Sequence, residues 1–565
     1  RAGIRTLAVQ YPGSYPRRGD GLVVAPLPRG LASLALAPGC EYVSHASPKR
    51  GPRLAPVRQA PRDRTDAGDG VFWLADVSIQ ASDILSDRSG LPGASRVGSV
   101  EDGNELAAEV AGPDGHTAAT QSVPIGLRVH RGGAGRGRAS LDIGSDPSST
   151  AVELEVGTWT PWLRIDVPTG SGDAQPASVR FKLRELSRDG QRFDLVRSEV
   201  YPMTGFAEPS ELEKILLDKV GPFFEHPSVL HQADDITSEW DIGPDVELSL
   251  EEMADQVTWL VASAKLLLEV RGWDLYYLHW HFPDTILHHF LAAADRSAPG
   301  YRPELASFAT KTIAHTLELA DRLVGGLAAL AGDDGYVFVV SDHGTAADRW
   351  VADVGQLLCE EGLAVRAVAG GLESAASKAL PIGGLQIKVN VARDREGRPL
   401  DLRAYEDIQA QVIDALLDWR EPTTGARPVA LALRREAAPL VGFWGPTAGD
   451  VIYCFNDGFA WPDPHHETTT HERSVRPAPL APVGAHHGPQ LPTAKSELSS
   501  NLALLLLTGP GVRRAHRWDH DRRGYPRLVD VVPTICELLG FVPPRQCQGA
   551  VLWELFEEGA LDRVK

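Results

Sequence analysis

The stretch Tyr336-Val-Phe-Val-Val-Ser-Asp-His-Gly344 joins an apolar run directly to an acid, an imidazole and a glycine. A short run that is apolar on both faces is typical of a strand inside a parallel sheet. Open α/β sheets bind ligands at the carboxyl ends of their strands, so Asp342 and His343 stand where a site is expected. Carboxylate oxygen and imidazole nitrogen suit zinc, manganese or iron. Taken alone, however, an Asp-His pair is more often a turn-capping acid followed by a loop histidine.

Two further segments carry residues of the same kinds. The strand candidate Trp273–Trp280 runs into a segment in which Asp284 and His288 are spaced to share one face of a helical turn, where they can hold one ion. The alternative is a helix start, with the acid near the positive end of the helix dipole and the histidine at an interface. The loop Gly484-Ala-His-His-Gly488 supplies further imidazoles, although such a loop alone is more often solvent-exposed. Together the three segments supply the ligands of a dinuclear Asp/His site.

The chain has 565 residues, more than one hydrophobic core usually supports, so we expect at least two domains. Residues 1–110 contain the start of an α/β core, with a strand candidate at Ile4–Val9, plus loops. Residues 111–205 alternate short apolar segments with turn residues, which is typical of an inserted antiparallel β module. Residues 206–565 alternate long helices with apolar strands and form the main α/β metal-binding core. We therefore predict a mostly parallel sheet flanked by helices. Helices are predicted at Glu251–Val270, Pro303–Leu330 and Leu528–Leu539, and strands at Leu385–Asn390 and Leu502–Thr508.

Composition excludes several classes of protein. The formal net charge of -19 argues against nucleic acid as a partner, because binding its phosphates needs a basic surface. A phosphorylated substrate stays possible, since bound cations reverse the local sign of the charge. The 5 cysteines are dispersed, which indicates reduced thiols and no cysteine metal site. The longest apolar run, Leu502–Leu507, is too short to span a bilayer, and we expect no signal peptide. A cytoplasmic protein without a membrane partner is therefore predicted.

The ordered motifs resemble those of the alkaline phosphatase superfamily. The motifs are Asp284-x-x-x-His288, Ser341-Asp-His-Gly344 and His487-Gly488, and the branch they resemble most is that of type I phosphodiesterases, nucleotide pyrophosphatases and related phosphohydrolases or phosphomutases. The turn Gly509-Pro-Gly511 and the ending from Leu528 to Gly540 extend the resemblance, which covers nearly the whole chain. It implies an alkaline phosphatase-like α/β fold and two divalent metal ions. Zinc fits the mixed carboxylate and imidazole ligands best, and manganese is the main competitor.

The resemblance also implies a partition of the ligands. One ion is held by Asp284, His288 and His487, the second by Asp342 and His343, with His486 as an alternative ligand. The family completes the second site with an Asp near the N-terminus and a Ser or Thr nucleophile on the following helix. Asp20-Gly21 follows a charged loop rather than an apolar strand, so it is a poor match to that unit. The catalytic nucleophile is therefore expected upstream of Arg1 or on a separate chain.

The activity implied by the resemblance is metal-dependent hydrolysis of a phosphodiester or phosphomonoester bond in a phosphorylated small molecule. Two other functions stay open. The first is a phosphomutase of the cofactor-independent phosphoglycerate type, which uses the same metals. The second is a non-catalytic pseudoenzyme or assembly subunit with the same fold.

Overall fold

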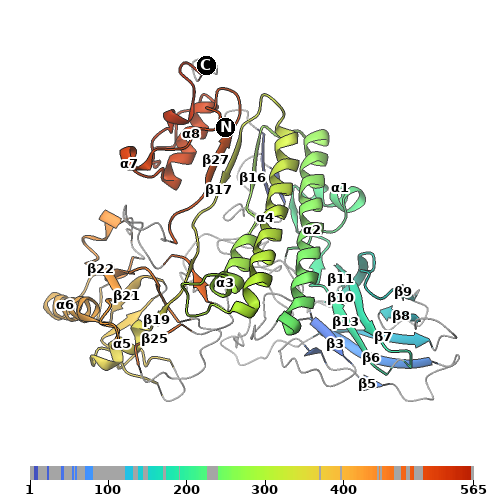
Figure 1. Ribbon diagram of the computed structural model, residues 1–565, viewed down its shortest axis with the longest axis horizontal. Helices are drawn as coiled ribbons and strands as arrows, with labels where there is room; N and C mark the ends of the chain where they lie inside the picture. Colours follow the sequence, from blue (N-terminus) through green and yellow to red (C-terminus); the bar gives the residue numbers. More distant parts are fainter. Residues whose placement is uncertain are drawn as a thin grey trace. The chain divides into compact units, whose positions relative to one another are not determined.

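Figure 1 shows the computed structural model of the protein as a ribbon. The chain forms two compact units, Arg1–Phe282 and Pro283–Lys565. Both contain helices and several small sheets, so the predicted mixed α/β class is confirmed. The predicted domain limits at residues 110 and 205 stay a prediction. The structure describes residues 5–9, 22–24, 40–43, 54–55, 58–59, 70–79, 121–130, 138–143, 151–168, 174–189, 191–225, 239–367, 371–382, 384–394, 397–441, 445, 448–462, 473–478, 484–488 and 500–560.

The first unit contains a small, mostly parallel sheet. Strand β1 (Thr6–Val9) pairs in parallel with β2 (Leu22–Val24) on one side and with β16 (Leu275–Leu278) on the other, and β15 (Ala207–Glu208) adds an antiparallel edge. Two residues of β1, Leu7 and Val9, are fully buried. The strands predicted in Ile4–Val9 and Trp273–Trp280 are thus confirmed, and they lie side by side.

Helix α2 (Glu239–Val270) leads into this sheet, and α1 (Glu211–Lys219) precedes it. The predicted end of α2 is confirmed: Gly272 adopts a φ of 69°, which a side chain disfavours, and ends the helical segment before β16. The helix begins earlier than the predicted Glu251. It includes Pro244, although proline lacks the N–H that a helix interior uses.

Antiparallel pairing dominates the other sheets described in the first unit, and these include strands within residues 40–79, which precede the β module predicted at residues 111–205. One sheet has the order β10-β11-β14, a second β12-β13-β3-β4, and a third β5-β6-β7-β8-β9, and only β3 and β4 pair in parallel. The bounds are β3 Cys40–Val43, β4 Leu54–Ala55, β5 Arg58–Gln59, β6 Gly70–Ile79, β7 Gln121–His130, β8 Arg138–Ile143, β9 Val152–Leu154, β10 Leu163–Pro168, β11 Ala174–Val179, β12 Phe181–Leu186, β13 Phe193–Arg197 and β14 Tyr201–Pro202.

The second unit begins with α3 (Phe282–Ala294) and α4 (Pro303–Ala331), and the second of these matches its predicted range to within one residue. Strand β17 (Val337–Val340) follows and pairs with β27 (Leu505–Thr508), beside which it lies in Figure 1. The pairing is antiparallel, so the predicted mostly parallel sheet around Tyr336–Val340 is not confirmed in the described part of the chain. The physical reason is that an apolar run reports burial but carries no information about strand direction. One face of the ribbon is covered by the C-terminal segment, through a cluster that includes Phe338, Leu507 and Leu538.

Between these strands the chain builds two more sheets on one hydrophobic core. The sheet of order β20-β21-β23-β22 is antiparallel, and the sheet of order β24-β19-β25 is mixed. Strand β21 confirms the strand predicted at Leu385–Asn390. The bounds are β19 Trp350–Ala352, α5 Val354–Glu360, β20 Ala379–Pro381, β21 Gln386–Val389, α6 Leu402–Asp418, β22 Val429–Arg434, η4 Ala438–Val441, β23 Val451–Phe455, β24 Phe459–Ala460 and β25 Val475–Pro477.

The C-terminal segment contains α7 (His520–Arg523), η5 (Leu528–Asp530), α8 (Val531–Leu538) and η6 (Trp553–Leu555). The helix predicted at Leu528–Leu539 is confirmed as η5 continued by α8. Within the ranges described above, no helix combines the length and the apolar character needed to cross a membrane.

Candidate metal centre

Helix α3 places Asp284 and His288 on one face. Oδ2 of Asp284 lies 3.3 Å from Nε2 of His288, because helix geometry brings residues four apart together. The acid stands in the first turn, where the helix dipole favours negative charge. The two side chains are 14% and 21% exposed, so the pair is largely withdrawn from water. The predicted shared helix face is confirmed.

Strand β17 ends at Val340 and delivers His343 through a tightly packed turn. The Gly344 N–H donates to the Ser500 carbonyl at 2.6 Å. A Cβ at this position would lie 2.4 Å from the Leu502 carbonyl oxygen, so only glycine fits so close to that backbone. The His343 side chain is 21% exposed, whereas that of Asp342 is 65% exposed, with its Oδ1 3.5 Å from Nε2 of His343.

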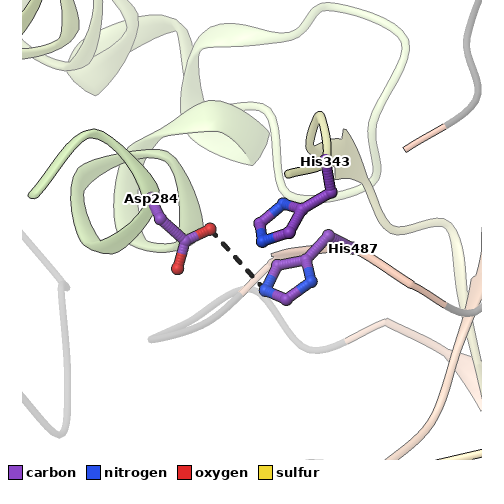
Figure 2. Close-up of side chains that lie close together, drawn as sticks. All are labelled: Asp284, His343 and His487. Carbon is purple, nitrogen blue, oxygen red and sulfur yellow. Dashed lines mark ion pairs between the residues drawn. The ribbon is translucent and has the colours of Figure 1, made fainter. Parts of the chain in front are cut away.

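A two-residue ribbon brings the third segment to the first two. Strand β18 (Ala346–Ala347) pairs antiparallel with β26 (Ala485–His486), which ends directly before His487. The His487 ring stacks on that of His343, with centroids 3.5 Å apart and planes 12° from parallel. Its Nε2 lies 3.6 Å from Oδ1 of Asp284 (Figure 2).

The ligand atoms of Asp284, His343 and His487 all lie within 4.8 Å of one another, and Figure 2 shows the three side chains pointing toward one another. A carboxylate oxygen at up to about 2.2 Å and an imidazole nitrogen at up to about 2.1 Å from one zinc ion stand at most about 4.3 Å apart, so the 3.6 Å between Asp284 and His487 suits a shared ion. One carboxylate and two imidazoles are also the donors of a catalytic zinc site, and three protein ligands leave a position open for water or substrate. The residues present therefore fit a divalent metal.

The protonation of the neighbouring histidines differs. Burial lowers the pKa of His487 to about 4, against the opposing charge of Asp284, so this imidazole is neutral at pH 7 and able to bind a metal. Burial also acts to lower the pKa of His288, but the hydrogen bond and charge of Asp284 outweigh it and leave that pKa raised. The other ring nitrogen of His288, Nδ1, donates to the Ala485 carbonyl at 2.5 Å.

The structure groups the predicted ligands differently from the sequence. His343, which the sequence assigns to a second ion with Asp342, lies against His487 and Asp284. His288 stays close to them, with its ring centroid 5.1 Å from that of His487. The assignment of the five predicted ligands to two separate ions stays a prediction. The ring of His486, the alternative ligand, contacts Asp348 and is not part of this group.

The partner of His486 is Asp348, a residue that the sequence did not single out. Nδ1 of His486 contacts Oδ2 of Asp348, and the two side chains are 13% and 4% exposed. In the sequence Asp348 is an isolated acid in a loop after the Ser-Asp-His-Gly motif. Asp348 stands out only because it is buried and because β18 pairs with β26. The spacing of residues along the sequence indicates neither of these features.

Comparison with curated proteins finds no match to the chain. A family model described as type I phosphodiesterase / nucleotide pyrophosphatase matches residues 186–486, which is more than half of the chain. The matched segment contains Asp284, His288, Asp342 and His343 and ends directly before His487, an outcome consistent with the alkaline phosphatase superfamily. The chain belongs to the type I phosphodiesterase / nucleotide pyrophosphatase family.

Proposed function

We propose that the protein is a metal-dependent phosphoesterase that hydrolyses phosphodiester bonds in a phosphorylated small molecule. The observation that carries the proposal is the convergence of Asp284, His343 and His487 from three separate segments of the chain. The family, whose members generally hydrolyse phosphodiester and pyrophosphate bonds, supports the same reaction class.

Each side chain of the site contributes differently to metal binding. Asp284 directs Oδ2 to His288, which it orients, and leaves Oδ1 facing His487 at 3.6 Å, where a shared ion would lie between the two. His487 presents a neutral imidazole, and the stacked His343 ring fixes its plane. A divalent ion bound here would supply Lewis-acid stabilisation of a phosphoryl group and would lower the pKa of the attacking group.

The proposal includes two features that the sequence predicts. A second ion would be held by the exposed carboxylate of Asp342 together with His343, and the first ion would then be held by Asp284, His487 and the neighbouring His288. A Ser or Thr hydroxyl attacks phosphorus, the P–O bond to the leaving alcohol breaks, and water then hydrolyses the resulting phospho-enzyme ester to free the phosphorylated product. Zinc is the expected metal, because the site offers both carboxylate oxygens and imidazole nitrogens as ligands, and manganese is the competitor.

Metal content and activity test the proposal together. The purified protein is loaded with zinc, freed of excess metal and analysed by mass spectrometry, and hydrolysis of bis(p-nitrophenyl) phosphate is then followed. Replacing His487 by Ala removes a ligand, so we expect metal affinity to fall by more than about 100-fold, beyond the typical effect of changing a residue that only supports a ligand. The matched control is His315→Ala, an exposed histidine on α4, which keeps both metal and activity.

We expect the wild type and His315→Ala to bind zinc and to hydrolyse the diester. We expect His487→Ala to lose both the zinc and the activity. Wild-type protein that retains no zinc or manganese contradicts the proposed site. Protein that binds metal but hydrolyses neither a diester nor a monoester contradicts the proposed activity while leaving the site in place.

A further inference from the structure

We propose that Asp348, acting through His486, is a positioning residue that holds His487 in its metal-binding orientation. The inference rests on the proposed function, because it concerns the same site. It assigns a role to the buried contact between Asp348 and His486, which lies beside the Asp284–His343–His487 group but contributes no atom to it.

Asp348 makes two contacts with the loop at residues 484–488, which contains His487. Its backbone N–H donates to the Gly484 carbonyl at 2.8 Å, and its carboxylate contacts Nδ1 of His486. Only 4% of the Asp348 side chain is exposed, and burying a carboxylate is costly unless it is hydrogen-bonded or paired. The His486 ring satisfies this need, and the contact fixes the ring with Nδ1 facing Asp348.

Contacts from two sides hold the loop in place. From α3, the His288 carbonyl accepts from the Gly484 N–H at 3.4 Å, and Nδ1 of His288 donates to the Ala485 carbonyl at 2.5 Å. From the β18 side, Asp348 holds the side chain of His486, whose ring packs edge-on against His288 with centroids 5.6 Å apart. His487 follows directly and faces Asp284. Loss of the Asp348 carboxylate therefore releases the side-chain restraint on the residue next to the ligand.

The geometry points to positioning by His486 rather than to ligation by it. Its Nδ1 is occupied by Asp348, and the group whose ligand atoms lie within 4.8 Å includes His487 but not His486. Metal sites depend on such supporting contacts, and their removal typically costs about 10- to 100-fold in metal affinity. We expect a loss of this size when the Asp348 carboxylate is neutralised.

The test measures metal binding directly. Dissociation constants for zinc and for cobalt(II) are determined by competition with a chromophoric chelator, and the visible absorption of bound cobalt(II) reports the ligand geometry. Replacing Asp348 by Asn should weaken both metals by about 10- to 100-fold and alter the cobalt spectrum. The matched control is Asp450→Asn: its side chain is 3% exposed and accepts from the Val389 N–H and from Arg393, so the change removes an equally buried carboxylate outside the site.

Two substitutions of His486 separate positioning from ligation. An Asn side chain places its amide N–H close to where Nδ1 of histidine stands, so His486→Asn keeps the donor to Asp348 and should keep the metal affinity within about threefold. A Gln side chain reaches instead to the position of Nε2, so His486→Gln should lose affinity as Asp348→Asn does.

The outcomes are distinguishable. An Asp348→Asn protein that melts cooperatively and binds metal with the wild-type dissociation constant and spectrum overturns the inference and leaves the proposed function standing. Equal losses in His486→Asn and His486→Gln also overturn it, because they identify His486 as a ligand. An equal loss in Asp450→Asn overturns it as well, because the effect is then general destabilisation. A wild type that binds no metal overturns the proposed function itself.

Discussion

Replacing Gly344 by Ala tests whether the backbone packing at the end of β17 sets the position of His343. The added Cβ would lie 2.4 Å from the Leu502 carbonyl oxygen and 3.3 Å from that of Ser500. Both neighbours are backbone atoms, so neither can move aside by changing a rotamer. One of the two segments must shift, and the 2.6 Å hydrogen bond from Gly344 to Ser500 weakens as it does.

The cost follows from three effects. Overpacking at a close contact costs about 1–3 kcal/mol, and a weakened hydrogen bond adds up to about 1 kcal/mol. Reduced freedom of the unfolded chain offsets about 0.4–1 kcal/mol, since Gly344 is not among the glycines with positive φ. The net loss lies between about 0 and about 3.6 kcal/mol, centred near 2 kcal/mol. With about 2.1 cal/mol/K of unfolding entropy per residue, the central value corresponds to a fall in melting temperature of roughly 3 °C for a unit of this size. The affinity for zinc should fall too, because His343 moves with the turn.

Differential scanning calorimetry gives the melting temperature, and Gly325→Ala provides the matched control. Gly325 lies inside α4, and a Cβ there meets nothing within 4 Å. The same chemical change should therefore stabilise the protein by about 0.5–1 kcal/mol at Gly325, because alanine favours a helix interior. A Gly344→Ala protein that melts at or above the wild-type temperature would refute the reasoning.

Two further predictions concern buried charge. Arg180, whose side chain is 7% exposed, stands 3.6 Å from the equally buried Glu252, so Arg180→Ala should lower the free energy of unfolding in urea by about 3–5 kcal/mol. Lys214→Ala, which breaks only an exposed ion pair, should cost less than about 1 kcal/mol, and similar losses for the two would contradict this. In the metal-free protein, NMR titration should show His487 titrating near pH 4 and His288 above its usual 6.5. The unfolded chain therefore binds a proton at His487 before the folded chain does, and this residue lowers stability as pH falls from 6.5 to 4. His288 has the opposite sign, since its stabilisation is complete below pH 6.5 and is lost as pH rises through its raised pKa. Coincident titration of the two rings would exclude these shifts.

Much of the local structure could be predicted from the sequence, because periodicity and breakers report burial and element ends directly. Helix α4 begins at Pro303 and ends before Gly332, as a proline at the start and a glycine after the end predict. The shared face of Asp284 and His288 needed only the helical repeat. These features depend on residues that are neighbours along the chain.

Features that depend on distant segments could not be predicted in the same way. The antiparallel pairing of β17 with β27 is one, because an apolar run fits either strand direction. The stacking of His343 on His487 is another, because it follows from the pairing of two-residue strands that have no pattern of their own. Asp348 was missed for the same reason, since its burial is decided by a segment far along the chain.

The chain leaves the site after Asp348 and returns to it at Gly484. The Asp348 N–H donates a hydrogen bond to the Gly484 carbonyl, so the two points are adjacent. Between these points it builds sheets with their own hydrophobic core. A segment whose two ends are adjacent can be lengthened, shortened or replaced without moving those ends, which is the condition under which domain insertion is tolerated. Evolution can therefore remodel residues 349–483 while Asp284, His343 and His487 keep their places, and an engineer can exchange the same stretch as a cassette.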